Sequence, residues 1–229
     1  MGRVTRRRLV FGSCLAALGF GCGGANPFLL FPTIFSGGQS KMPAEYPLTP
    51  HNKKQDAKVV VLVSNKVGVD PDLVNVDRML NAELIQILDA RVKENEDKVL
   101  VLKMPKLDEY KSQNVNWRSE SPFDIGKDIA EGTDYVINVE IVEIDLFKPG
   151  PRKDWLQGHA TVSVTAYDLT KPLKEAAYKK DITFEYPQGR EVPLESRAQL
   201  STFRMAFIQR IASDVSTLFV DSSPVRRVD

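Results

Sequence analysis

The stretch VINVEIVEIDLF, residues 136–147, decides the fold of this 229-residue chain. In its first half, apolar residues occupy every second position from Ile137 to Ile141, which is the period of a half-buried β-strand. After Ile141 the apolar residues occupy even-numbered instead of odd-numbered positions, from Val142 to Leu146. One extra residue at this junction, a β-bulge, lets a bent strand keep one apolar face, so the sequence predicts a bulge here.

The segments that follow and precede this strand continue the same architecture. Residues 124–131 predict a short helix that Gly132 ends. Residues 158–168 alternate small apolar residues with polar ones and predict a second strand, joined to the first by a loop at 148–156. A third strand at 178–186 places Tyr, Ile and Phe side chains on one face, so three antiparallel strands follow one another.

The amino-terminal half of the domain predicts a strand and a helix. Residues 59–63 are all Val or Leu, as expected of a strand that is buried on both faces. Asp70 and Pro71 are residue types typical of a helix N-cap and of the first helical position. Apolar residues then recur every four positions from Val76 to Val92, so this helix is expected to bury one face.

The remaining segments complete the order of the elements. Residues 99–102 predict a short strand, residues 105–121 a loop or irregular helix, and residues 196–220 a final amphipathic helix. The order is therefore β-α-β-α-β-β-β-α, an α/β (α+β) fold whose helices pack on a mixed sheet. A right-handed crossover makes the first two strands parallel. We expect a single domain at 58–221, followed by a tail at 222–229.

Residues 1–21 predict an export signal. Three consecutive arginines, Arg6 to Arg8, precede an uncharged apolar run at 9–20. The arginines after Thr5 resemble a twin-arginine signal, and an ordinary secretory signal is the alternative interpretation. Cleavage after this segment would remove four of the 31 basic residues and no acidic one, which leaves 27 basic against 30 acidic residues. A mature chain with a formal charge of −3 does not predict nucleic-acid binding.

Cys22 is the predicted site of lipid attachment. It follows the apolar run and a small residue, Gly21, which resembles the lipobox of bacterial lipoproteins. The resemblance implies that the Cys22 thiol carries an acyl chain such as palmitate. Cys14 is a poorer candidate because almost no apolar core precedes it. A cleaved signal with incidental cysteines and an uncleaved anchor are the alternatives. Residues 22–57, rich in Pro, Gly and Ser, predict the anchor region and a flexible spacer.

The sequence contains no recognisable catalytic, cofactor-binding or metal-binding motif. The two histidines, His51 and His159, are far apart, and no HExxH, GxSxG or phosphate-binding glycine loop occurs. A single cysteine remains after cleavage, so no cysteine metal site is predicted. Ser64 ends the first strand, where α/β folds often place sites, but no partner base can be named for it. We therefore expect no catalysis, and an exported hydrolase with a site near Ser64 is the alternative.

The order of the elements resembles that of a group of bacterial envelope proteins. The likeness is carried by residues 59–64, the helix after Asp70, the segment 124–136 and the strand 162–169, which ends Ala-Tyr-Asp-Leu. The group comprises the curli-secretion lipoprotein, the lipoprotein activators of penicillin-binding proteins and the amino-terminal domain of TolB. The resemblance implies a role in envelope assembly, secretion or activation through protein contacts, without catalysis.

The loop between the two longest strands is the predicted contact with a partner. It carries Arg152 and Trp155, residue types enriched at interface hot spots, and its prolines lower the entropy cost of ordering. The alternative is that Trp155 folds back and caps the end of the sheet. The predicted function is that of a cell-envelope lipoprotein, anchored by Cys22 to the inner or outer membrane and facing the periplasm, that binds other envelope proteins. Self-assembly into a homo-oligomeric envelope subunit is a further alternative.

Overall fold

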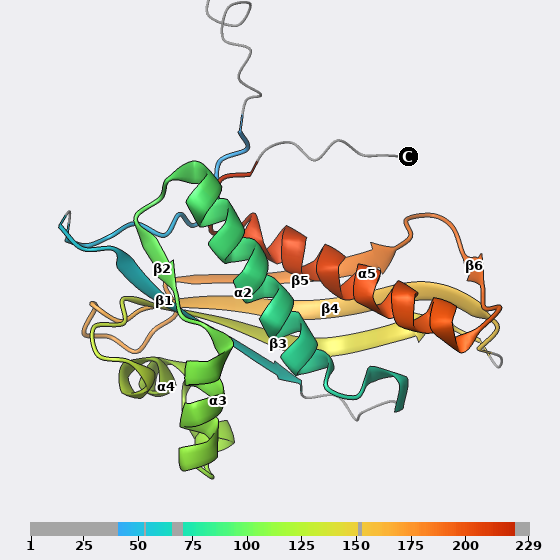
Figure 1. Cartoon of the computed structure of the whole chain (residues 1–229), viewed down its shortest axis with the longest axis horizontal. Coiled ribbons are helices and arrows are strands. Elements are labelled where there is room, and N and C mark those ends of the chain that lie inside the picture. Colours follow the sequence, from blue (N-terminus) through green and yellow to red (C-terminus); the bar gives the residue numbers. More distant parts are fainter. Residues whose placement is uncertain (1–40, 53, 66–70, 151–152, 223–229) are drawn as a thin grey trace, which may run out of the picture. The chain divides into compact units, whose positions relative to one another are not determined.

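A mixed sheet forms the centre of the structure, a computed structural model that describes residues 41–52, 54–65, 71–150 and 153–222 (Figure 1). The strands are β1 (Ala57–Asn65), β2 (Val99–Val101), β3 (Tyr135–Phe147), β4 (Trp155–Asp168), β5 (Tyr178–Tyr186) and β6 (Val192–Pro193). Their order across the sheet is β2-β1-β3-β4-β5, and β6 pairs with the start of β4. β1 runs parallel to β2 and β3, and the other pairs are antiparallel. The predicted fold class is confirmed.

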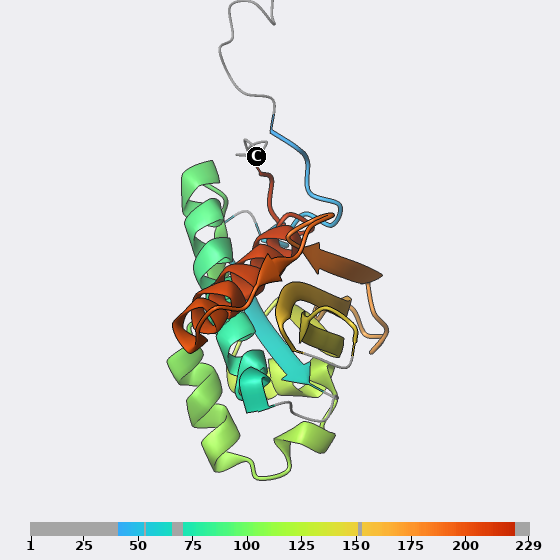
Figure 2. The same ribbon diagram turned by 90° about the vertical axis from the view of Figure 1, so that its right-hand side faces the viewer.

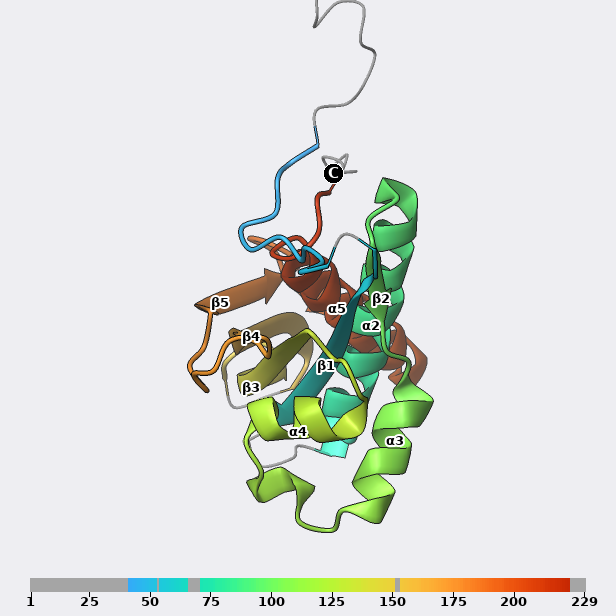
Figure 3. The same ribbon diagram turned by 90° about the vertical axis from the view of Figure 1, so that its left-hand side faces the viewer.

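Helices cover both faces of this sheet (Figures 2 and 3). The helical segments are η2 (Pro71–Leu73), α2 (Val76–Asn95), α3 (Met104–Gln113), η3 (Trp117–Ser119), α4 (Pro122–Ile129) and α5 (Arg197–Ser216). α2 and α5 pack on one face and form the main core, whereas α3 and α4 pack on the other face and form a smaller core. β1 contributes to both cores, as its unbroken apolar run predicts. None of the helices in the described part of the chain has the length and hydrophobicity needed to cross a membrane.

The long helix α2 begins later than the sequence predicts. Asp70, the expected N-cap, lies outside the described residues. Pro71 instead opens the short turn η2, and α2 starts at Val76. Asn75 separates the two with a φ of 61°, a left-handed conformation that Asn adopts more readily than most residues. The apolar face that runs from Val76 to Val92 is buried, as predicted.

β3 contains the predicted β-bulge. Between the pair Ile141–Val162 and the pair Glu143–Thr161, the register advances by two residues in β3 and by one in β4. Val142 is therefore the extra residue, and its side chain is 50% exposed. The prediction that Val142 belongs to the buried set is wrong, because a bulged residue drops out of the pairing and the alternation resumes only after it.

The segment between β2 and β3 is more regular than the sequence predicts. It contains the helix α3, which is buried through Leu107 and Tyr110, three positions apart, and carries Pro105 in its first turn. α4 begins at Pro122, two residues earlier than expected, because the side chain of Ser121 caps it by accepting a backbone hydrogen bond. The sequence does not predict the short strand β6.

Residues 41–50 form a strap that packs on the domain. Its backbone nitrogens donate hydrogen bonds to carbonyl oxygens of residues 218–222, directly after α5 (Figure 1). Leu48 is buried in the main core, and the ring of Tyr46 packs edge-on against a tyrosine of β3. The spacer expected at 22–57 is therefore corrected: its residues 41–50 belong to the folded domain, because the apolar side chains between the prolines find partners there.

Candidate functional site

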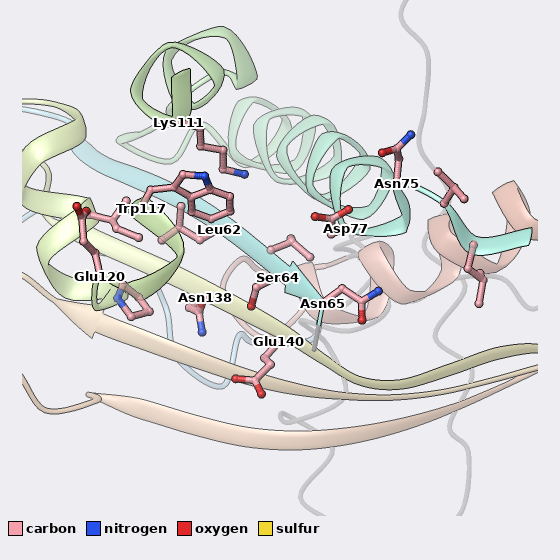
Figure 4. Close-up of a pocket in the computed structure, with 15 residues that line it drawn as sticks. Leu62, Ser64, Asn65, Asn75, Asp77, Lys111, Trp117, Glu120, Asn138 and Glu140 are labelled. Carbon is pink, nitrogen blue, oxygen red and sulfur yellow. The ribbon is translucent and has the colours of Figure 1, made fainter. Parts of the chain in front are cut away.

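A pocket opens beside the carboxyl end of β1, between the sheet and the segments that cover it (Figure 4). Its volume is about 650 Å³, which is the size of a small-molecule site. Four parts of the chain meet there: the end of β1, the middle of β3, the segment η2 with the start of α2, and the connection from α3 to α4. The pocket includes Ser64, the strand-end position that the sequence singles out.

The sheet contributes polar side chains to the pocket. Ser64 pairs with Glu140, and Leu62 pairs with Asn138, across the parallel strands β1 and β3. Residues two apart on a strand share a face, so all four lie on the side of the sheet that α3 and α4 cover. Figure 4 shows Ser64, Asn138 and Glu140 close together on the two strands. The smaller core therefore ends at the pocket, where the same face of the sheet carries polar side chains.

The connection from α3 to α4 contributes an aromatic wall. Trp117 lies in η3 and is partly buried, and the ammonium group of Lys111 lies 4.3 Å from the centroid of its ring. This is the geometry of a cation–π contact. Asn75 and Asp77, at the start of α2, line another side of the pocket (Figure 4). The pocket therefore combines a flat aromatic surface with amide and carboxylate groups.

A buried tyrosine holds this connection in place. The hydroxyl of Tyr110 in α3 donates a hydrogen bond to Oε2 of Glu120, between η3 and α4. Burial and then this hydrogen bond raise the pKa of the Tyr110 hydroxyl, so the group remains a donor at neutral pH. A second contact, 2.9 Å between Arg78 and Asp108, joins α2 to α3 at the surface. Both contacts fix elements that line the pocket.

The described lining residues of the pocket have a negative formal charge. The described lining residues include three carboxylates, Asp77, Glu120 and Glu140, and one ammonium group, that of Lys111, so their formal charge is −2. These residues include no histidine or cysteine, and Ser64 is their single hydroxyl group. In the described part of the chain, no group of three His, Cys, Asp or Glu side chains could hold a metal ion. The arrangement is suited to holding a ligand through hydrogen bonds and stacking.

Trp155, the predicted partner contact, lies away from the pocket at the start of β4. It pairs with Pro193 of β6, and its carbonyl oxygen accepts a hydrogen bond of 3.0 Å from the backbone nitrogen of Lys148. The side chain is 46% exposed. Its backbone is thus held on two sides while the indole reaches solvent. Arg152, predicted to act with it, lies outside the described residues, as does Cys22.

The two histidines occupy separate surroundings, and neither lines the pocket. His51 belongs to the segment after the strap, where its ring stacks on Tyr135 with 5.2 Å between centroids. Its Nε2 lies 3.2 Å from Oδ1 of the buried Asp168. His159 lies in β4, with its Nε2 3.9 Å from a carboxylate oxygen of Glu143. The structure therefore does not bring the histidines together.

Similarity to known proteins is limited to solved structures, because no protein-family model and no curated protein matches the chain. The chain is similar to a PelC dodecamer from Paraburkholderia phytofirmans, with 14% identity over 79% of this chain and 97% of that one and a TM-score of 0.39. A hypothetical protein from Chlamydia trachomatis has 16% identity over 70% and 96%, with a TM-score of 0.42. A lipoprotein from Neisseria meningitidis has 13% identity over 68% and 98%, with a TM-score of 0.40. Similarity at this level decides nothing about function, and the resemblance to the curli-secretion group stays a prediction.

Proposed function

We propose that this chain is an exported lipoprotein anchored to a membrane of the cell envelope through an acylated Cys22. Its domain binds another envelope protein and catalyses no reaction of its own. One observation carries the proposal: the strap attaches to one end of the sheet, and an exposed tryptophan lies at the other end. A domain tethered through its strap would present Trp155 far from the point of attachment.

The two ends of β3 define this separation. At its start, the hydroxyl of Tyr135 donates a hydrogen bond of 2.9 Å to the carbonyl oxygen of Thr49, directly after Leu48 in the chain. At its end, Phe147 is followed by Lys148, which bonds to Trp155. β3 has 13 residues, and at about 3.3 Å per residue such a strand spans roughly 40 Å. The strap and the tryptophan are therefore separated by most of the length of the sheet.

Several contacts link the residues around Trp155 to one another. The ammonium of Lys153 lies 4.7 Å from the centroid of the Phe147 ring. Lys148 forms an ion pair with Glu191, and the backbone nitrogen of Leu194 donates to the carbonyl oxygen of Asp154 over 2.8 Å. A surface that is ordered before binding loses less conformational entropy on association. An exposed tryptophan in such a setting is the kind of residue that dominates interface energies.

Fractionation of cells tests the anchor. Cys22→Ser should release the protein into the soluble envelope fraction or block cleavage of the leader, because the thiol that receives the lipid is gone. Cys14→Ser is the matched control and should stay with the membrane. A Cys22→Ser protein that is cleaved and still sediments with membranes in high salt would contradict lipid anchoring.

Site-specific crosslinking tests the partner surface. A photoreactive amino acid in place of Trp155 should capture one envelope protein, and the same group in place of Val115, which is 89% exposed, should not capture it. Arg152→Ala with Trp155→Ala should weaken binding of that purified protein by at least about 30-fold, as expected for loss of a hot spot. His159→Ala should leave its affinity unchanged. Full affinity in the loop variant would contradict the proposed surface.

A second candidate function is self-assembly, and the charge pattern of β5 favours it. In the described part of the chain β5 pairs with β4 alone, so its other side is an edge of the sheet (Figure 3). The exposed face of β5 carries every second residue of the strand: Lys179, Asp181, Thr183 and Glu185. An unpaired edge can be extended by a strand from another molecule.

One antiparallel register of two β5 copies brings opposite charges together at both ends of the pairing. A two-fold axis at Ile182 opposes Lys179 of each copy with Glu185 of the other, so the pairing contains two ion pairs. A shift of the axis to residue 181 opposes the two Asp181 side chains, and a shift to residue 183 opposes Asp181 with Glu185. Opposed like charges destabilise a strand pair, so the first register is favoured over both shifted ones.

Sedimentation of charge variants tests this assembly. Lys179→Glu and Glu185→Lys should each shift a dimer towards monomer, because each variant opposes like charges. The double variant restores the ion pairs in reverse and should restore the dimer. A wild-type protein that stays monomeric at every concentration, or single variants that sediment as wild type does, would contradict self-assembly through β5.

A further inference from the structure

We infer that the pocket beside the carboxyl end of β1 binds a neutral, hydroxyl-rich ligand of the oligosaccharide class. The inference rests on the pocket alone and is independent of the anchor and of the surface around Trp155. Three properties of the pocket lead to it: its polar sheet side, its aromatic wall and the charges of its described lining residues.

The polar side matches hydroxyl groups. Ser64 and Asn138 carry groups that both donate and accept hydrogen bonds, and the neighbouring carboxylate of Glu140 accepts them. A sugar hydroxyl also donates and accepts, so adjacent hydroxyls of one ring can satisfy a row of such groups. Asn65 and Asn75 add further amides to the pocket (Figure 4). A ligand that is mainly apolar would form no hydrogen bonds with Ser64 or Asn138, at a cost in affinity.

The aromatic wall matches the other surface of a sugar ring. The C–H groups of a pyranose form an apolar face, and an indole ring offers a flat surface of similar size. Trp117 lines the pocket, and because the ammonium of Lys111 lies over one face of its ring, a sugar would stack on the other face. The hydrogen bond from Tyr110 to Glu120 fixes the backbone just after Trp117. A platform that is already ordered lowers the entropy cost of binding.

The charges of the described lining residues argue against two kinds of ligand. Asp77, Glu120 and Glu140 repel a phosphate or carboxylate ligand, and Lys111, the one lysine among the described lining residues, does not compensate for them. A cationic group stacked on Trp117 would lie beside Lys111, which already places a positive charge 4.3 Å from the indole centroid. The charges therefore disfavour an anionic ligand and a cation on the face of the indole. With a volume of about 650 Å³, it has room for a neutral ligand larger than a single sugar ring.

Calorimetric titration tests the inference on the full chain, solubilised in a detergent that carries no sugar. The neutral probes are maltotriose, cellotriose and N,N′,N″-triacetylchitotriose; trigalacturonic acid, trilysine and trialanine serve as anionic, cationic and peptide probes. We expect saturable binding of at least one neutral trisaccharide and at least about tenfold weaker binding of the other three probes. Trp117→Ala should reduce the trisaccharide affinity at least about tenfold. Trp155→Phe, the matched control at the second tryptophan, should not change it.

A second variant keeps the test decisive if Trp117→Ala does not fold. Asn138→Val removes an amide from the sheet side and retains a residue that favours strands, so it should also weaken binding of the trisaccharide. The inference is overturned if no neutral trisaccharide binds at millimolar concentration. It is equally overturned if a charged probe or trialanine binds as tightly, or if both variants bind as wild type does.

Discussion

The backbone nitrogen of Tyr46 donates a hydrogen bond to the carbonyl oxygen of Leu218 over 2.8 Å. This bond joins the strap to the turn that follows α5, near the opposite end of the sequence. Side chains reinforce it: the hydroxyl of Tyr178 in β5 donates to Oε2 of Glu45 over 2.8 Å, and Lys180 forms an ion pair with the same carboxylate. The strap is thereby attached to both α5 and β5.

The buried leucine of the strap should contribute to the stability of the whole domain. Leu48 is 7% exposed and packs in the main core. Leu48→Ala should lower the free energy of unfolding in urea by about 2–4 kcal/mol, because it leaves a cavity in packed surroundings. Val115→Ala, at a position that is 89% exposed, should change it by less than about 0.5 kcal/mol. Equal effects of the two changes would show that the strap does not pack in solution.

Asp168 should make stability depend on acid pH. Burial acts to raise the pKa of this carboxyl group, but hydrogen bonds from Thr170 and the charges of His51 and Lys171 outweigh it, so the pKa is lowered. The unfolded chain therefore takes up this proton first as the pH falls. The stability that Asp168 contributes is complete above the usual carboxyl pKa of about 4 and is lost as the pH falls through the lowered value.

The isosteric variant Asp168→Asn tests this dependence. At pH 7 it should unfold at a lower urea concentration than wild type, with a loss of about 1–3 kcal/mol, because its hydrogen bonds are no longer charge-assisted. The difference between the two proteins should shrink as the pH falls below about 4. A difference that stays constant from neutral to acid pH would contradict the charge-based explanation.

Asn81 should be replaceable by an apolar residue with a gain in stability. It lies in α2, is 1% exposed, and within the described part of the chain neither its Nδ2 nor its Oδ1 has a hydrogen-bond partner. Asn81→Leu should raise the free energy of unfolding by about 1–2 kcal/mol, because it removes the cost of an unpaired buried amide. Asn95→Leu is the control on the same helix and should give no gain, since Asn95 donates to the carbonyl oxygen of Asp221. A loss of stability in Asn81→Leu would mean that the amide is satisfied in solution.

Removal of the bulged residue should be tolerated. Val142 has no partner in β4, so its deletion leaves Ile141 and Glu143 opposite the residues that they face now. Every flanking side chain keeps its face, and we expect a soluble, folded protein whose β3 is less bent. Deletion of Val164, which lies in regular pairing, should reverse the faces of one half of β4 and prevent folding. Measurement of soluble yield and cooperative unfolding distinguishes the two outcomes.

The strands and the longest helices follow from local patterns in the sequence. The alternation through β3 and β4 decides which side chains face the core, and the bulge is visible as a change of parity at Ile141. α2 and α5 are visible because their apolar residues recur at helical spacing over many turns. The start of α2 is less predictable, because Asp70 and Pro71 are equally compatible with the short turn η2 that precedes it.

The strap and the pocket depend on contacts between distant segments, which no local pattern contains. Tyr46 and Leu48 are two apolar residues among prolines and resemble a linker until the turn after α5 gives them partners. The pocket combines residues from β1, α2, β3 and the α3–α4 connection. Of these, Ser64 alone carries a signal in the sequence, its place at a strand end. Trp117 stands out only by residue type, and its place in the pocket depends on the packing of α3, for which the sequence predicts a loop or irregular helix.

The pairing of Met42 with Ser222 has a consequence for how the domain can be re-engineered. The two ends of the described domain run side by side as antiparallel segments (Figure 1). A short peptide could join them and close the chain into a circle, which could then be opened beside the exposed Val115. Under the proposed anchoring through Cys22, the lipid of this circular permutant would attach next to α3, and the same fold would meet the membrane in a different orientation. The place where the tether enters the fold would then set the direction in which Trp155 points.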